Sequence, residues 1–192
     1  MNHEDEIRMQ IETSIAVKRE LLKNITPIIE VTEIMIEAYK NNKKVVWFGN
    51  GGSAADAQHL ATELVSKFYM ERAALPSMAF TTNTSTLTAI SNDYDFNRIF
   101  ERQVEAFVDE GDVVIGISTS GNSENVIRGL KKAKKMGAIT VGLTGKTGGK
   151  MKQIVDYLIA VPSTETPRIQ EAHIMIGHIL CNLVEVAMFG KE

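Results

Sequence analysis

The chain has 192 residues, of which 44% are hydrophobic, and its formal net charge at pH 7 is −3. The hydrophobic share is ordinary for a folded protein and too high for a disordered one, and the length fits one domain better than two. The balance of 21 basic and 24 acidic residues argues against nucleic acid as a partner, because neutralising phosphates requires a basic face.

The N-terminus and the single cysteine indicate where the protein works. Glu4, Asp5 and Glu6 make the start of the chain too acidic for a signal peptide. We find no apolar stretch of the roughly 18–20 uninterrupted residues that a membrane span needs. Cys181 lies among apolar residues and has no second cysteine to pair with, which indicates a buried thiol in a reducing compartment. We therefore expect a cytoplasmic protein with no membrane partner.

Helical periodicity dominates the first forty residues. Ile7, Ile11 and Ile15 are four residues apart, and a second apolar stripe follows Pro27, a typical first-turn residue of a helix. These patterns predict an N-terminal helical hairpin at about residues 6–41.

Beyond this hairpin, short apolar runs alternate with helical patterns. Five runs predict buried strands, the last of them weakly: 44–48, 112–117, 139–143, 157–161 and 77–80. Helices are expected at 54–66, 123–136 and 166–188. The last helix is apolar on more than one side, so we expect its own domain or a partner subunit to bury it all round. The alternation predicts an α/β fold with a mostly parallel five-stranded sheet covered on both faces, in a single domain over residues 1–192.

A glycine-rich loop, Gly49-Asn50-Gly51-Gly52-Ser53, joins the first strand to a helix. Glycines allow a ligand to approach the backbone closely, and the start of a helix offers free N–H groups to an anion. The spacing is neither G-x-G-x-x-G nor a Walker A loop, so it indicates neither a dinucleotide nor a nucleoside triphosphate. A tight turn without a ligand explains this loop equally well.

A second loop, Ser118-Thr119-Ser120-Gly121-Asn122-Ser123, also stands between a strand and a helix. Helix capping by Ser123 would explain only one of its four hydroxyl groups. A phosphate explains all four, since it has several acceptor oxygens and would sit at the positive end of a helix dipole. Both loops follow the carboxyl ends of strands, where open α/β sheets bind ligands, so we predict a phosphate site here.

Histidines and a carboxylate near these loops are candidates for chemistry. His59 and Glu63 are four residues apart and share one helix face, as a structural hydrogen-bonded pair or as catalytic groups. His178 lies in an apolar run, where an imidazole is costly without a partner. A satisfied core histidine is the simpler interpretation of His178. We expect His173 to face solvent or a neighbouring helix, and His3 to lie in a frayed terminus.

With these motifs assembled, the chain resembles the sugar isomerase (SIS) domain family, and within it the isomerases of phosphorylated heptoses. The resemblance runs from the N-terminal helices to about Phe189, and four motifs carry it in order: Gly49–His59, Ser91-Asn92-Asp93, Ser118–Ser123, and Arg168-Ile169-Gln170-Glu171 leading to His178. It implies a three-layer α/β/α sandwich of the SIS type. It also implies a homotetramer with sites at subunit boundaries, in which the helices at 6–41 mediate assembly.

The resemblance implies interconversion of sedoheptulose 7-phosphate and D-glycero-D-manno-heptose 7-phosphate through an enediol, the first step of bacterial heptose biosynthesis. It assigns acid–base catalysis to Glu63 and His178. One zinc ion per subunit is implied, with ligands His59, Glu63, Gln170 and His178. Substrate contacts are implied at Asn50, Gly51, Gly52, Ser53, Asn92, Asp93, Ser118, Thr119, Ser120, Ser123 and Gln170.

The implied chemistry suits these residue types. A carboxylate is a suitable base for a proton on carbon, an imidazole can shuttle protons between oxygens near neutral pH, and zinc could polarise the carbonyl. Which of Glu63 and His178 is acid and which is base stays open, as does how either moves a proton while bound to zinc. Gln170 and His178 are eight residues apart, about 12 Å along a straight helix. We therefore predict that residues from neighbouring subunits complete the site.

Three other functions are open to a chain of this kind. A binding protein of the DnaA initiator-associating type is built on the same domain, but we expect it to lack the pair Glu63 and His178. A transcription factor that senses sugar phosphates needs an additional DNA-binding domain, for which this chain has no spare length. An isomerase of a pentose or hexose phosphate stays possible, because pocket shape sets the length of the sugar.

Overall fold

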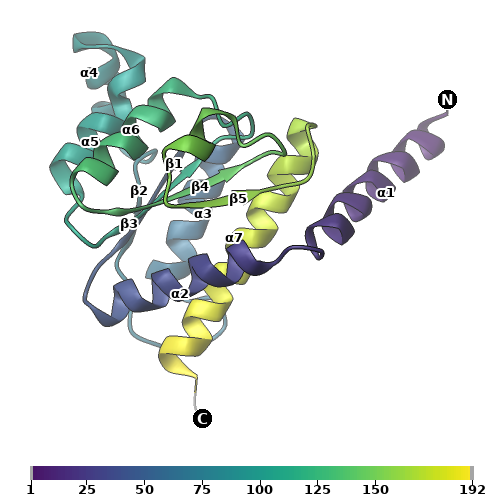
Figure 1. Ribbon diagram of the computed structural model, residues 1–192, viewed down its shortest axis with the longest axis horizontal. Helices are drawn as coiled ribbons and strands as arrows, with labels where there is room; N and C mark the ends of the chain where they lie inside the picture. Colours follow the sequence, from purple (N-terminus) through teal and green to yellow (C-terminus); the bar gives the residue numbers. More distant parts are fainter. Residues whose placement is uncertain (1, 191–192) are drawn as a thin grey trace.

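The computed structural model describes residues 2–190 and is built around a parallel five-stranded sheet between two layers of helices (Figure 1). The strand order is β2-β1-β3-β4-β5, and every neighbouring pair is parallel. The strands are β1 (Val45–Gly49), β2 (Ser77–Ala79), β3 (Val113–Ile117), β4 (Ile139–Thr144) and β5 (Tyr157–Ala160). The expected α/β/α sandwich is confirmed, and each of the five predicted strands is present.

The register of the central strands brings the two predicted loops together. All residues of β1 and β3 are buried, as expected for apolar strands covered on both faces. Val45 pairs with Val113, and at the other end Gly49 pairs with Ile117. Because both strands end at the same level, the glycine-rich loop after Gly49 and the hydroxyl loop after Ile117 begin side by side.

The helices are α1 (His3–Leu21), α2 (Thr26–Lys40), α3 (Gly52–Val65), α4 (Thr84–Asp93), α5 (Ile99–Phe107), α6 (Glu124–Lys135) and α7 (Thr166–Phe189), with short 3-10 helices at Phe96–Arg98 and Gly149–Gln153. Two layers of helices cover the sheet, each with its own apolar cluster. One cluster packs α2, α3 and α7 on one face and includes Met35, Leu60 and Ile176. The other packs α5 and α6 on the opposite face around Phe48 and Phe100, whose rings stack.

The two N-terminal helices are present, but they do not fold back on each other as a hairpin. Figure 1 shows α1 projecting away from the body while α2 lies on it. Leu21 is the one buried residue of α1, and the apolar side chains of Ile7 and Ile11 are exposed. Periodicity identifies an apolar stripe correctly, but it does not show whether the partner of that stripe belongs to the same subunit.

Helix α7 is long and apolar enough to cross a membrane by length and composition alone. In this fold it packs against α2 and α3, and its buried residues include the charged Arg168 and Glu185. Such burial is typical of the core helix of a globular domain. Burial is not complete on all sides, however, because Ile179, Leu183 and Val186 are 38–46% exposed.

Candidate active site

The glycine-rich loop and the hydroxyl loop are joined by a reciprocal pair of amides. The Asn50 side chain donates to Asn125 Oδ1 (2.9 Å), and the Asn125 side chain donates to Asn50 Oδ1 (2.8 Å). Asn125 is buried at the start of α6. Two such bonds fix the distance between the glycine-rich loop and the start of α6, which directly follows the hydroxyl loop.

The N-cap side chain of α6 does not cap the helix, although the Val126 N–H in the first turn donates to Asn125 Oδ1 (2.9 Å). Ser123 occupies the N-cap position but makes no capping hydrogen bond, and its Oγ lies 2.9 Å from the Oγ of Ser118. Gly121 has a positive φ of 66°, and a Cβ there would lie 2.3 Å from the Gly148 carbonyl oxygen. A tight, glycine-dependent turn thus gathers hydroxyl groups at an open helix N-terminus, which suits a phosphate.

Gln170, at the start of α7, lies directly against the glycine-rich loop. A Cβ added at Gly52 would stand 2.6 Å from Gln170 Nε2. Glycine at this position therefore makes room for the glutamine side chain, and this contact explains one glycine of the loop in physical terms.

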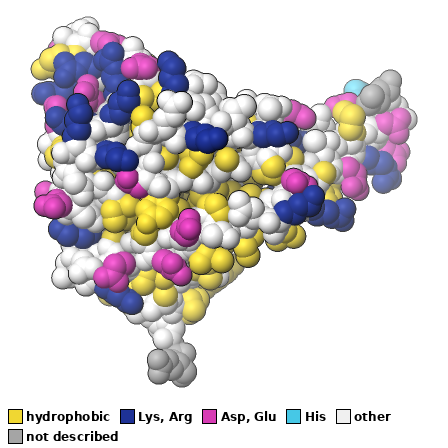
Figure 2. Space-filling view, viewed as in Figure 1, with side chains coloured by type: hydrophobic (Ala, Val, Ile, Leu, Met, Phe, Trp, Pro, Cys, Tyr) yellow, Lys and Arg dark blue, Asp and Glu magenta, His cyan; other side chains and the backbone are white. Residues whose placement is uncertain are grey.

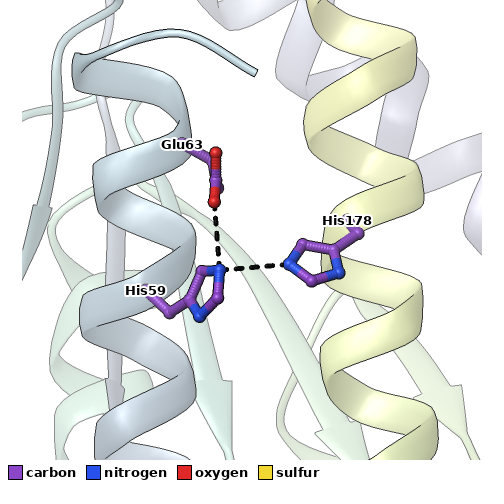
Figure 3. Close-up of side chains that lie close together, drawn as sticks. All are labelled: His59, Glu63 and His178. Atoms are coloured by element: carbon purple, nitrogen blue, oxygen red, sulfur yellow. Dashed lines mark hydrogen bonds and ion pairs between the residues drawn. The ribbon is translucent and has the colours of Figure 1, made fainter. Parts of the chain in front are cut away.

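His59, Glu63 and His178 form a compact trio between α3 and α7 (Figure 3). His59 Nε2 is 3.0 Å from Glu63 Oε1 and 3.2 Å from His178 Nε2. Figure 3 shows His59 and Glu63 pointing from α3 and His178 pointing toward them from α7. Residues 119 positions apart in sequence are thereby brought into contact.

The close packing of α3 on α7 makes this contact possible. A Cβ at Gly177 would stand 2.3 Å from a methyl group of Leu60. Glycine at this position therefore leaves room for Leu60 at the contact between the two helices, and the neighbouring residues in each helix are His59 and His178. The trio lies beside this close contact.

The trio has the donor set of a zinc site. One ligand atom from each residue lies within 4.8 Å of the other two, and the set consists of two imidazole nitrogens and one carboxylate oxygen. Zinc in proteins is bound by such atoms, and catalytic zinc sites hold three protein ligands and leave a position open. The side chains present therefore fit a divalent metal ion.

Comparisons with known proteins agree with this geometry. The profile of the SIS domain family matches residues 11–145. The phosphoheptose isomerase of Clostridium acetobutylicum is 57% identical over 189 residues, which cover 97% of this chain and 96% of that protein. The chain belongs to the phosphoheptose isomerase family.

Two solved structures of this family have the same fold. The phosphoheptose isomerase from Neisseria gonorrhoeae is 40% identical, with a TM-score of 0.91, over 96% of this chain and 99% of that chain. The one from Francisella tularensis is 36% identical, with a TM-score of 0.93, over 96% of this chain and 98% of that chain. The resemblance stated from the sequence motifs is confirmed.

Within one subunit, some residues that the phosphoheptose isomerase resemblance singled out lie apart. Gln170 is at the glycine-rich loop beside Gly52, whereas the trio begins at His59, about 10 Å further along α3. Asn92 and Asp93 are exposed at the end of α4, a helix that buries none of its residues, and they hydrogen-bond to each other. The fold of a single subunit therefore does not gather all the predicted site residues at one point.

The expectation for His173 was wrong. Its side chain is fully buried, and one ring nitrogen lies 3.2 Å from the Thr144 carbonyl oxygen. Burial lowers the pKa of His173 to about 4, so the ring is neutral at physiological pH. The apolar residues around it in α7 could not show which side of the helix faces the sheet.

Several residues around the site were not found from the sequence. Asn125 bridges the two loops, the Phe68 ring lies 5.7 Å from the His178 ring, and Glu185 is buried in α7 with Arg72 as its partner. Asp56 has one buried carboxylate oxygen that finds no hydrogen-bond partner among residues 2–190, and burial raises the pKa of Asp56. A carboxylate within an apolar helical run was a usable signal for Glu185, whereas Phe68 carried none.

Proposed function

We propose that the chain interconverts sedoheptulose 7-phosphate and D-glycero-D-manno-heptose 7-phosphate as the first step of heptose biosynthesis. Membership of the phosphoheptose isomerases makes the chain an aldose–ketose isomerase of a phosphorylated heptose. The contact of His59, Glu63 and His178 between α3 and α7 is the observation that carries the proposal, because it supplies the proton-transfer groups that this reaction requires.

The reaction moves a carbonyl between C2 and C1 through an enediol. One group must take a proton from one carbon and return a proton to the neighbouring carbon, while another moves a proton between the two oxygens. We assign the carbon-bound proton to the Glu63 carboxylate and the oxygen-bound proton to the His178 imidazole. Nε2 of His59 lies 3.0 Å from Glu63 Oε1 and 3.2 Å from His178 Nε2, so the two proton-transfer groups converge on one point.

We assign phosphate binding to the hydroxyl loop and the open first turn of α6. Ser118, Thr119, Ser120 and Ser123 provide hydroxyl groups there, and the backbone N–H groups of α6 provide further donors. In the same proposal the glycine-rich loop, Gln170, Asn92 and Asp93 contact the sugar. No lysine or arginine is needed for this cradle.

We propose zinc as the metal, held by His59, Glu63 and His178, with Gln170 as a further ligand. When bound, zinc would polarise the sugar carbonyl and stabilise negative charge on its oxygen. Since Gln170 and His178 are about 12 Å apart along α7, a Gln170 side chain reaches the metal most directly across a subunit boundary.

We propose that the protein assembles as a cytoplasmic homotetramer through α1, α2 and the outer face of α7. These helices expose Ile7, Ile11, Ile179 and Leu183, and the turn between α1 and α2 exposes Leu22 and Ile25. Figure 2 shows apolar side chains gathered over the part of the body that carries α2 and α7. A groove lined by Ile15, Leu22, Ile25, Ile28, Met175 and Ile179 continues this surface at the root of α1. Contiguous apolar surface of this kind is typical of a protein interface.

The substrate assignment is tested by offering the purified chain phosphorylated sugars of five, six and seven carbons and following aldose–ketose conversion. We expect turnover with sedoheptulose 7-phosphate and at least tenfold lower kcat/KM with the shorter sugars. Higher kcat/KM with a pentose or hexose phosphate would move the assignment to that sugar. Absence of any conversion with zinc supplied would favour a binding protein.

A further inference from the structure

A buried ion pair lies just beyond the C-terminal end of α3, the end that carries Glu63. The side chains of Arg72 and Glu185 are 1% and 0% exposed, and their closest atoms are 2.8 Å apart. Glu185 also accepts backbone hydrogen bonds from the N–H groups of Phe68 (2.8 Å), Tyr69 (2.7 Å) and Met70 (2.9 Å). One carboxylate of α7 thus binds three consecutive residues of the loop that follows α3.

Arg72 closes the C-terminal end of α3. Its guanidinium donates to the carbonyl oxygens of Glu63 (2.9 Å) and Leu64 (2.8 Å), and also to those of Ser66 and Ala73. The last carbonyls of a helix have no partner within the helix, and without one the last turn frays. Glu63 lies in this last turn, so the direction of its carboxylate depends on the turn staying helical.

The loop held by Glu185 reaches the other side of the trio. Phe68 packs its ring 5.7 Å from the ring of His178, and Tyr69 stacks edge-on against Phe68 at 4.5 Å. The ion pair of Arg72 and Glu185 therefore contacts residues next to both Glu63 and His178, the residues to which proton transfer is assigned. It contacts Glu63 through the backbone and His178 through Phe68.

We infer that Arg72 and Glu185 are positioning residues for the isomerisation, acting through Glu63 and Phe68 to fix the trio. The inference rests on the proposed roles of Glu63 and His178. Neither Arg72 nor Glu185 touches the hydroxyl loop, so the pair affects the proton-transfer groups and leaves the phosphate cradle intact. Loss of the pair therefore lowers kcat and leaves KM nearly unchanged.

The test compares the wild type with a double variant, Arg72→Met with Glu185→Gln, which removes both charges and leaves no unpaired buried ion. Arg72→Lys serves as the conservative variant. It restores a cation beside Glu185 but cannot reach four carbonyls at once. We expect at least a tenfold lower kcat for the double variant, KM within twofold of the wild type, and partial rescue by Arg72→Lys.

Asp112→Asn is the matched control for lost stability. Asp112 is 1% exposed and, like Glu185, binds one cation and backbone N–H groups, but its bonds go to Lys44 and Asp109. At a temperature where all variants are folded, this control should retain wild-type kcat. The imidazole NMR signals of His59 and His178 in metal-free protein should move in the double variant and stay in place in the control.

Two outcomes separate this inference from the proposed function. If Glu63→Gln is inactive but the double variant keeps wild-type kcat and unchanged imidazole signals, the positioning role is wrong and the proposed function stands. If Glu63→Gln keeps wild-type kcat, the proposed role of Glu63 fails first. A further outcome concerns stability alone. If kcat falls equally in the double variant and in Asp112→Asn, Arg72 and Glu185 have a purely structural role.

Discussion

Glu185 shows how a charge can be kept inside an apolar helix. Burial alone would raise its pKa, but hydrogen bonds from the N–H groups of Phe68, Tyr69 and Met70 and from Arg72 outweigh burial and lower the pKa to about 2. The ionised form is therefore the one that the fold stabilises. A carboxylate of this kind links the stability of the molecule to pH.

We predict that Glu185 makes the fold sensitive to acid. Because the folded pKa lies below the ordinary value of 4.5, this stabilisation is present above about pH 4.5 and is lost as pH falls toward about 2. Near neutral pH, Glu185→Gln should lower the free energy of unfolding by roughly 3–5 kcal/mol, as expected when a buried ion pair is broken. Thermal unfolding of both proteins between pH 7 and pH 3 measures this, and the gap in Tm should narrow as pH falls. A gap that stays constant would contradict the assignment.

For single residues, the sequence predicted which side chains belong to the candidate site better than it predicted what those side chains contact. His59 and Glu63 were paired correctly because helical spacing alone puts them on one face. The partner of His178 is His59, which lies 119 positions away in the sequence. Whether His173 is buried depends on how α7 is rotated against the sheet. Both depend on tertiary packing, which spacing within one helix does not report.

At the scale of elements, the contact between α3 and α7 determines whether the trio forms. We predict that Gly177→Ala forces these helices apart, because the added methyl group would overlap Leu60. Overpacking of this kind costs about 1–3 kcal/mol in the free energy of unfolding, and here it would also separate His59 from His178. Denaturant unfolding and a zinc titration of the metal-free protein measure the two effects.

Leu60→Ala in the same chain is the matched control, since it makes room for the added methyl group. The double variant should recover zinc affinity relative to Gly177→Ala alone. If Gly177→Ala binds zinc as tightly as the wild type, close helix packing does not set the geometry of the trio.

The five strands could be predicted from the sequence, whereas helices α4 and α5 were missed. Buried parallel strands are short continuous apolar runs, so all five were found from sequence to within a few residues. Residues 81–111 received no assignment, yet they form α4 and α5 with a 3-10 turn between them. Helix α4 buries none of its residues, and its core-facing pattern of Leu87 and Ile90 is too short for a periodicity argument.

For the whole molecule, the exposed apolar surface of α1, α2 and α7 favours an oligomer as the functional unit. Helix α1 projects from the body (Figure 1). Ile179, Leu183 and Val186 of α7 are partly exposed. The sequence predicted helices that assemble the protein, but the direction of α1 could be seen only in the structure. Asn92 and Asp93, isolated at the end of α4, and Gln170, two turns from the trio, fit a site completed by neighbouring subunits.

We predict that Leu183→Asp dissociates the assembly and abolishes most of the activity. A carboxylate buried in an apolar interface is strongly disfavoured, so the equilibrium should move toward single subunits. Sedimentation velocity would report the change in mass, and kcat should fall at least tenfold in parallel. Phe107→Asp, at an exposed apolar residue on the opposite face of the sheet, serves as the control and should stay assembled. A single subunit with full activity would rule out a shared site.

Proton transfer by Glu63 is tested most directly by measuring sedoheptulose 7-phosphate conversion by the wild type and by Glu63→Gln. Each protein is stripped of metal and then supplied with zinc. We predict that zinc restores the wild type, whereas kcat of the variant stays at least about a hundredfold lower even when its zinc content equals that of the wild type. Conversion by Glu63→Gln at the wild-type rate would rule out proton transfer by Glu63, and no conversion by the zinc-loaded wild type would rule out the proposed substrate.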